Sequence, residues 1–120
     1  IAGPTITFIK NPSDEVVTSY MQNASALIFP GLDDFGITPV EAMAAGKPVI
    51  AYKSGGALDY IVAGVNGDFF KSQTVDALCS VLQSHIANNY SSDDIKKSVQ
   101  KFSVESFHKN LQTYVYSVLQ

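Results

Sequence analysis

Short apolar runs and longer periodic segments alternate along this chain. The runs from Thr5 to Ile9, from Ala26 to Phe29 and from Pro48 to Tyr52 are each soon followed by proline, glycine, asparagine or serine residues, as strands usually are. A shorter run, Asp68 to Phe70, follows the turn signal Asn66-Gly67. These four runs predict β-strands.

The other segments show the three- and four-residue spacing of amphipathic helices. Ser13 is placed to cap a helix that continues to Ala24, with its apolar side formed by Val16, Val17, Tyr20 and Met21. A second helix should stop at Ala45, before Gly46. Further helices are predicted at Leu58 to Val62, Val75 to Ala87, Asp93 to Phe102 and Val104 to Leu119, with a mobile polar loop from Ala87 to Asp94. We expect the last three helices to pack on the sheet face or to cross toward a second domain.

Strands that alternate with helices predict an α/β fold. Right-handed crossovers would give a Rossmann-like parallel sheet with flanking helices, and ligands of such sheets gather at the carboxyl ends of the strands. A length of 120 residues corresponds to one domain, and a composition with 46% hydrophobic and 16% charged residues suits a globular chain with a filled core.

The candidate chemistry follows the second predicted strand. Pro30 to Ile37 would form a loop, after which Thr38 can cap a helix with Pro39 at its first position. Glu41 stands three residues after this cap, as in a capping box. The amino end of a helix favours a phosphate, because its N–H groups are free and its dipole end is positive. With the carboxylates of Asp33 and Glu41 beside it, the layout predicts a pocket for a phosphorylated polyol.

Simpler structural interpretations stay open at each position. Thr38 to Glu41 can be a capping box alone, and Asp33-Asp34 can be a solvated turn pair. Glu41 could also cap the empty helix and still meet a ligand later. Ser54-Gly55-Gly56 can be a strand-to-helix turn, or it can let a phosphate approach the backbone.

A known pattern includes this segment. Its matching positions are Phe35, Gly36, Glu41, Ala42, Met43, Ala44, Gly46, Pro48 and Val49, and Asp33 stands where the pattern has a glutamate. The segment resembles the donor-site signature of retaining, nucleotide-sugar-dependent glycosyltransferases of the GT-B fold, group 1 (family 4).

The similarity extends over nearly the whole chain. Ile6 to Ile9, Ser54 to Gly56, Gly67 to Phe70 and Phe102 to Glu105 resemble strands, turns and the start of the last helix in that family. The resemblance implies the C-terminal half-domain of a GT-B glycosyltransferase, truncated at its amino end. Residues 1–120 would then be part of the nucleotide-sugar (donor) binding domain, with the acceptor domain absent. The family grips the donor diphosphate with an arginine and a lysine near the start of this domain, and the sequence contains no arginine.

The resemblance also implies roles for individual residues. Asp33 would be the catalytic residue that hydrogen-bonds hydroxyls of the transferred sugar. Glu41 would accept hydrogen bonds from the ribose hydroxyls, as ionised carboxylates do from diols. The implied substrate-binding residues are Asp33, Asp34, Phe35, Gly36, Ile37, Thr38 and Glu41.

The implied function is transfer of a hexose-type sugar, with retention, from a nucleoside diphosphate sugar to a glycan or lipid-linked acceptor. No metal and no cofactor is expected, and the isolated chain should be inactive. A cytoplasmic location is expected, with peripheral contact at a membrane surface as a further option for the full-length protein. The alternatives are a non-catalytic nucleotide- or phosphate-binding α/β module and a phosphorylase-like or inactive descendant of the same fold that serves as an interaction surface.

The net charge and the reactive side chains bear on the possible partners of this chain. A net charge of −3 argues against a nucleic-acid partner. The dispersed Lys96, Lys97, Lys101 and Lys109 are offset by Asp93, Asp94 and Glu105, which favours a solvated face over a membrane-binding one. Cys79 is the single cysteine, and its helical spacing with Val75, Leu78 and Leu82 predicts a core position. His85 and His108 lie far from the candidate segment and are interpreted as surface or packing residues.

Overall fold

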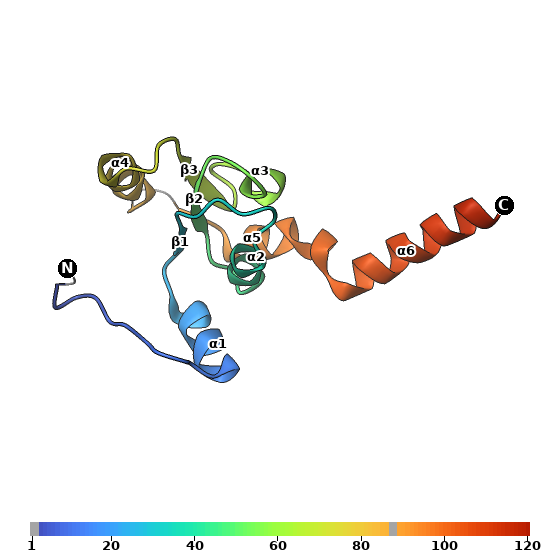
Figure 1. Cartoon of the computed structure of the whole chain (residues 1–120), viewed down its shortest axis with the longest axis horizontal. Coiled ribbons are helices and arrows are strands. Elements are labelled where there is room, and N and C mark those ends of the chain that lie inside the picture. Colours follow the sequence, from blue (N-terminus) through green and yellow to red (C-terminus); the bar gives the residue numbers. More distant parts are fainter. Residues whose placement is uncertain (1–2, 87–88) are drawn as a thin grey trace.

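The computed structural model describes residues 3–86 and 89–120, with only the main chain of residue 86. The Cα radius of gyration is 16.5 Å, whereas a compact domain of this length would have about 14 Å. The difference arises from two extensions, which Figure 1 shows on opposite sides of a small α/β body. One is the chain before α1 (Asp14–Asn23), and the other is the long helix α6 (Val104–Leu119).

The body is built on a parallel sheet of the order β1-β2-β3. Its strands are β1 (Leu27–Phe29), β2 (Val49–Tyr52) and β3 (Gly67–Phe70), and Ile28 pairs with Ile50, which pairs with Asp68. Val49, Ile50 and Ala51 of the central strand are fully buried, as expected of a strand that is covered on both faces. The α/β class and the parallel pairing are therefore confirmed.

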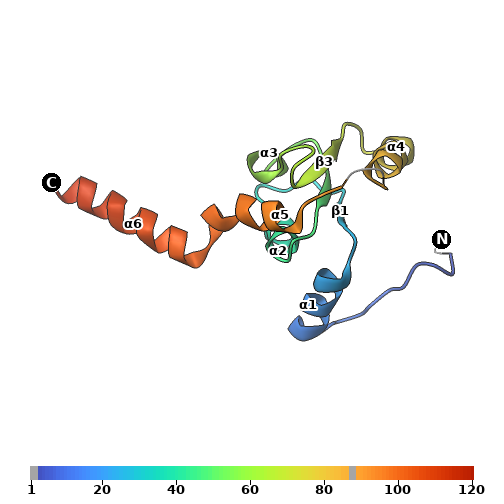
Figure 2. The ribbon, with the colours of Figure 1, turned by 180° about the vertical axis from the view of Figure 1, so that it is seen from behind.

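Helices complete the core around this sheet. The helix α2 (Ile37–Ala44) contacts β1, β2 and α5 (Ser92–Ser98), while α4 (Val75–Ile86) contacts β3. Figure 2 shows α2 and α5 side by side next to the sheet. The short α3 (Ala57–Tyr60) contributes its buried residues Ala57 and Tyr60 to the same core cluster as α2 and α5. The buried side chains of Met43, Ile95 and Val99 meet in the same cluster as the strand residues.

One buried polar side chain joins several elements. Asn66 is 0% exposed, and its Oδ1 accepts a hydrogen bond from the N–H of Val62 at 2.8 Å. Its Nδ2 donates to the carbonyl oxygen of Tyr60 and to the Oγ of Ser98, both at 2.9 Å. Since Asn66 lies in the turn before β3, it fastens the end of α3 to α5 as well as to its own turn.

The predicted strand from Thr5 to Ile9 is wrong. A strand needs a hydrogen-bonded neighbour, and within residues 3–86 and 89–120 no strand pairs with this segment. Ile6 is 55% and Phe8 is 78% exposed, so the apolar run is extended but uncovered. The following helix is as predicted, because Ser13 accepts a hydrogen bond from Val16 N–H and Ala24 is its C-cap.

The other predicted elements differ from the structure mainly at their ends. The helix predicted for Leu58 to Val62 is α3, which begins one residue earlier and ends two residues earlier. The last residue predicted for α4, Ala87, lies outside the described residues, as does part of the predicted loop from Ala87 to Asp94, and residues 92–94 of that loop belong to α5. The helix predicted for Asp93 to Phe102 is interrupted at Val99, where the chain turns into the 3₁₀ helix η1 (Gln100–Phe102). The predicted bounds of α6 are correct, but α6 has no buried residue and does not pack on the sheet.

The predicted core position of Cys79 is also wrong. The thiol is free and exposed, and Val75 is 76% exposed. The half-buried positions of α4 among residues 75–85 are Ala77, Leu78, Val81, Leu82 and His85. Helical spacing alone could not tell which neighbouring face of α4 would meet β3.

Candidate functional site

Loops from all three strands meet at the carboxyl edge of the sheet. The loop of residues 30–36 follows β1, and the N–H of Gly56, after β2, donates to the carbonyl oxygen of Asp33 at 2.8 Å. From the segment after β3, Gln73 Nε2 donates to the carbonyl oxygen of Pro30 at 2.9 Å. The 30–36 loop is thus held from two sides, at the edge where the sequence predicted the site.

The glycine pair after β2 supports this loop directly. A Cβ on Gly56 would lie 2.3 Å from the carbonyl oxygen of Asp34 and 2.4 Å from Cα of Phe35. Gly55 has φ +61°, and its Cβ would lie 2.5 Å from the carbonyl oxygen of Asp33. These glycines therefore form a turn that packs against the loop backbone, and the space beside them is filled by protein.

The two aspartates lie on the exposed side of the loop. Oδ1 of Asp33 accepts a hydrogen bond from the N–H of Asp34 at 2.8 Å. This contact uses one lone pair of a carboxylate that has about four acceptor positions, so most of its capacity is free. Asp33 can therefore still accept hydrogen bonds from hydroxyl groups of a ligand.

Phe35 anchors the loop through its ring. The ring meets Tyr60 edge-on with centroids 5.5 Å apart, and it meets Phe102 in the same way at 5.3 Å. Edge-to-face pairs at such distances are favourable. The side chain of Phe35 is thereby fixed between α3 and η1, which leaves its main chain as the part available to a ligand.

The predicted helix start, with Thr38 as the cap and Pro39 as the first helical residue, is wrong, because α2 begins two residues earlier. Gly36 is the N-cap with φ 89° and has no side-chain cap, Ile37 is the first helical residue, and Pro39 is the third. A positive φ is easy for glycine and costly for other residues, which explains why the chain turns into the helix at this position. Glu41 is accordingly a second-turn residue and forms no capping box. The N–H groups at the start of α2 are free of side-chain caps, as an anion site requires.

Tyr60 lies directly beneath this helix start. A Cβ on Gly36 would be 2.6 Å from the hydroxyl oxygen of Tyr60, and Tyr60 itself is 2% exposed. Burial, followed by the negative charges of Asp33 and Asp59, raises the pKa of Tyr60 above its ordinary value of 10.0. The sequence pattern did not single out Tyr60, since its position depends on tertiary contacts.

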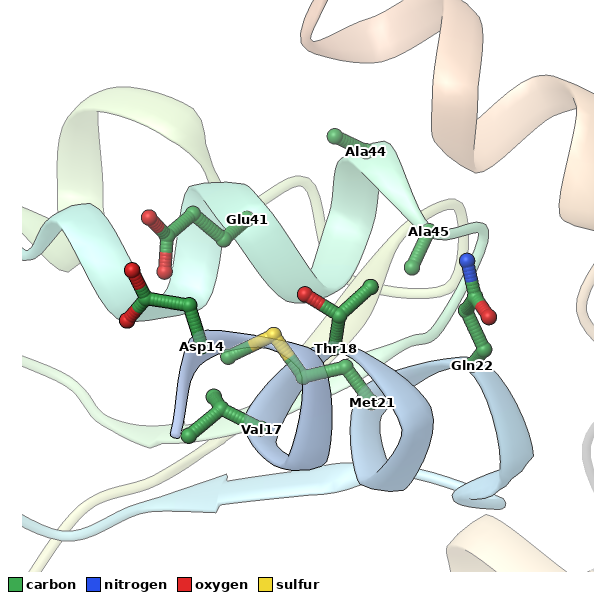
Figure 3. A pocket seen from close by; sticks show the side chains of 8 residues that line it. All are labelled: Asp14, Val17, Thr18, Met21, Gln22, Glu41, Ala44 and Ala45. Carbon is green, nitrogen blue, oxygen red and sulfur yellow. The ribbon is translucent and has the colours of Figure 1, made fainter. Parts of the chain in front are cut away.

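Glu41 lies in a groove between α1 and α2. The groove has a volume of about 400 Å³ and is lined by Asp14, Val17, Thr18, Met21, Gln22, Glu41, Ala44 and Ala45. Figure 3 shows the carboxylates of Glu41 and Asp14 directed toward the same end of this groove, with Thr18 and Met21 pointing from α1 toward α2. Glu41 is exposed and has no hydrogen-bond or ion-pair partner among the described residues.

The structure thus brings together Asp33, Asp34, Phe35 and Gly36 on one supported loop, next to Ile37 and Thr38 in the first turn of α2. The groove of Glu41 is not lined by Asp33. Convergence of the two carboxylates on a single ligand therefore stays a prediction.

The histidines and other potential ligands lie elsewhere. His85 stacks on Tyr90 with ring centroids 5.1 Å apart, and His108 is an exposed residue of α6. Within the described part of the chain, no three histidine, cysteine, aspartate or glutamate side chains are grouped as metal ligands. None of the described helices has both the length and the apolar character needed to cross a bilayer.

Comparison with known families gives a match over most of the chain. The family model described as Glycosyl transferases group 1 matches residues 2–102. This range includes the 30–36 loop, α2 and all three strands. It ends at η1, before α6.

Individual relatives agree with that match. The chain is 34% identical over 116 residues to the alpha-1,3/1,6-mannosyltransferase ALG2 of Dictyostelium discoideum, covering 92% of this chain and 27% of the relative. It is 30% identical over 112 residues to sucrose synthase of Melioribacter roseus, covering 85% of this chain and 14% of the relative. The chain therefore spans less than a third of the length of these relatives.

A solved structure has a similar fold. The crystal structure of Anabaena Alr3699/HepE in complex with UDP-glucose matches with a TM-score of 0.58 and 24% sequence identity. The match covers 81% of this chain and 29% of the other. The sheet and its flanking helices thus have a counterpart in a larger protein.

Proposed function

This chain belongs to the glycosyl transferases group 1 family, and on that premise we propose that it forms part of the donor-binding domain of a glycosyltransferase. The proposed reaction moves a hexose-type sugar, with retention, from a nucleoside diphosphate sugar to a glycan or lipid-linked acceptor. The names of the mannosyltransferase and sucrose synthase relatives favour a hexose. The UDP-glucose in the similar structure favours a nucleotide sugar as the donor.

One observation carries the proposal. The family's donor-site pattern falls on the 30–36 loop and α2, and the structure holds that loop at the carboxyl edge of the sheet with uncapped N–H groups at the helix start. Parallel α/β sheets bind their ligands at this edge. Free N–H groups at the amino end of a helix suit the anionic part of a nucleotide sugar.

Each group would have a distinct role during transfer. The N–H groups of Ile37 and Thr38 would stabilise negative charge that develops on the leaving diphosphate, which is an electrostatic contribution to catalysis. Asp33 would accept hydrogen bonds from sugar hydroxyls and so orient the ring, with the amides of Phe35 and Gly36 beside it. Glu41 would accept hydrogen bonds from the ribose hydroxyls on the side of α2 that faces the groove. This requires a ligand long enough to reach from the 30–36 loop to that groove.

The full-length protein would supply the remaining groups. The acceptor site is proposed to lie in another domain, and the arginine that the family resemblance implies for the diphosphate is not among these 120 residues. The proposal locates the protein in the cytoplasm, with a membrane surface as the site of a lipid-linked acceptor. Lys96, Lys97, Lys101 and Lys109 are exposed and compatible with solvent or with such a surface.

Donor titration of the full-length protein tests the proposal. UDP-, GDP- and ADP-sugars would be titrated by calorimetry, and the best donor would then be incubated with glycan and lipid-linked acceptors. Binding and transfer with the anomeric configuration retained are expected, as read by NMR of the product. Binding without transfer to any acceptor would support the non-catalytic nucleotide-binding alternative, and no binding would refute the donor assignment.

A further inference from the structure

Tyr60 has a buried side chain whose hydroxyl group forms no hydrogen bond within the described residues. The residue ends α3 and is 2% exposed, and its hydroxyl oxygen is buried without a hydrogen-bond partner among the described residues. Its main chain is held by Asn66, whose Nδ2 donates to the Tyr60 carbonyl oxygen at 2.9 Å. Since the ring itself is buried and packs edge-on against Phe35, Tyr60 cannot easily turn its hydroxyl toward solvent.

The hydroxyl faces the 30–36 loop. Gly36 lies so close that a Cβ there would be 2.6 Å from the hydroxyl oxygen, and the ring of Phe35 meets the Tyr60 ring edge-on. After burial, the negative charge of Asp33 is the next cause that raises the pKa of this hydroxyl. The hydroxyl therefore lies directly beneath the helix start proposed to face the diphosphate, against the same loop that carries the carboxylate proposed to contact the sugar.

An unpartnered buried hydroxyl is unfavourable for folding. Its loss of hydration is not compensated by a hydrogen bond, whereas phenylalanine would fill the same volume without that cost. The ring of a phenylalanine at position 60 could pack equally well against Phe35 and the core residues around α3. The hydroxyl is thus explained better by a partner that it gains in another state of the loop than by the ligand-free fold.

We propose that Tyr60 is a positioning residue of the donor site, whose hydroxyl donates a hydrogen bond to the carboxylate of Asp33 when a nucleotide sugar is bound. This inference rests on the proposed function. The carboxylate of Asp33 would then accept hydrogen bonds from the Tyr60 hydroxyl and from the N–H of Asp34. Its remaining lone pairs would be available to the sugar hydroxyls. Tyr60 would act through Asp33 and need not touch the donor.

The substitution Tyr60→Phe tests the inference in the full-length protein. We expect the dissociation constant for the sugar donor to rise about tenfold, as for loss of one hydrogen bond to a charged acceptor, while that for the bare nucleoside diphosphate changes less than about twofold. The melting temperature should stay constant or rise, because an uncompensated hydroxyl is removed. If the hydroxyl served only the fold, the melting temperature of the variant would fall and the two dissociation constants would change equally.

Tyr90→Phe provides that contrast within the same chain. The hydroxyl of Tyr90 donates to Oδ2 of Asp68 and lies near the carbonyl oxygen of Gly67, at the amino-terminal end of β3. This variant should melt at a lower temperature and bind the donor as tightly as the wild type.

The outcomes separate the inference from the function on which it rests. A wild-type protein that binds no nucleotide sugar refutes the proposed function. A wild-type protein that binds the donor, together with a Tyr60→Phe variant of equal affinity, refutes the role of Tyr60 alone. Equal losses of sugar donor and nucleoside diphosphate with a lower melting temperature would also refute it. In a double-mutant cycle with Asp33→Ala, the two effects on donor affinity should be non-additive, and additivity would exclude the proposed contact.

Discussion

The main-chain N–H of Gly56 donates a hydrogen bond to the carbonyl oxygen of Asp33 at a distance of 2.8 Å. This bond joins the turn after β2 to the loop after β1, so the proposed sugar-binding residue is fixed by a neighbouring crossover. The two backbones can approach so closely because position 56 has no side chain.

Gly56→Ala should therefore destabilise the protein. Its Cβ would lie 2.3 Å from the carbonyl oxygen of Asp34 and 2.4 Å from Cα of Phe35, and these backbone atoms cannot rotate away. We expect the free energy of unfolding to fall by about 2–3 kcal/mol, as measured by urea denaturation. Gly31→Ala is the matched control, because a Cβ there meets nothing within 4 Å. Equal stability of the two variants would contradict the packing of the loop on Gly56.

Glu41→Gln should weaken donor binding without affecting the fold. Glu41 is exposed and has no described partner, so its charge is available to ribose hydroxyls. An amide is a poorer acceptor, and we expect about a tenfold higher dissociation constant in calorimetric titrations of the full-length protein. Glu105→Gln, on the exposed first turn of α6, should bind the donor normally. Unchanged affinity in Glu41→Gln would remove Glu41 from the site.

Asp33→Ala should discriminate between two ligands. If the carboxylate contacts the transferred sugar, affinity for the sugar donor should fall at least about tenfold, and affinity for the bare nucleoside diphosphate should fall much less. Asp76→Ala in the exposed first turn of α4 serves as the control. Equal losses for both ligands would instead indicate that Asp33 shapes the loop.

Asn66→Ala should be strongly destabilising. The substitution removes the partners of Val62 N–H, the Tyr60 carbonyl oxygen and Ser98 Oγ at a position that is 0% exposed. A loss of about 3 kcal/mol in urea denaturation is expected from buried polar groups left without partners. Asn23→Ala removes one hydrogen bond from an exposed helix end, and it should cost less than about 0.5 kcal/mol. A small effect at Asn66 would mean that its network does not hold α3 in place.

Stability should decrease at alkaline pH through Tyr60. The folded state raises the pKa of Tyr60 above 10.0, first by burial and then by the charges of Asp33 and Asp59. Ionisation of this hydroxyl therefore favours the unfolded state, so the stability of the wild type does not depend on this group below about pH 10 and decreases as the pH rises through the raised folded pKa. Melting temperatures between about pH 8 and about pH 11 should fall less in Tyr60→Phe than in the wild type. Parallel curves for the two proteins would contradict this linkage.

Local signals predicted much of the fold. Ser13 accepts a hydrogen bond from Val16, as a helix-capping serine should, and Gly46 has the positive φ of a helix stop. The apolar run that became β2 was recognisable because a strand that is buried on both faces is apolar throughout. The turn signal Asn66-Gly67 marked the position of β3. These features depend on residues that are close in sequence.

The errors fall where distant contacts decide between two local options. Thr38 carried the local signal for a helix start, but the N-cap is Gly36, where its lack of a side chain permits a backbone turn of positive φ next to Tyr60. The run from Thr5 to Ile9 had strand character but no strand to pair with among the described residues. The buried hydroxyl of Tyr60 could not be predicted, because no sequence pattern reports an unmet hydrogen bond.

The short edge strand β1 has a practical consequence for handling this polypeptide. Among the described residues it pairs only with β2, and Ile28 is 43% exposed. An edge with free N–H and C=O groups beside apolar side chains is a template for intermolecular β-pairing. Recombinant preparations limited to these residues should consequently be prone to self-association at high concentration, so dilute samples and a solubilising fusion partner are advisable for spectroscopy.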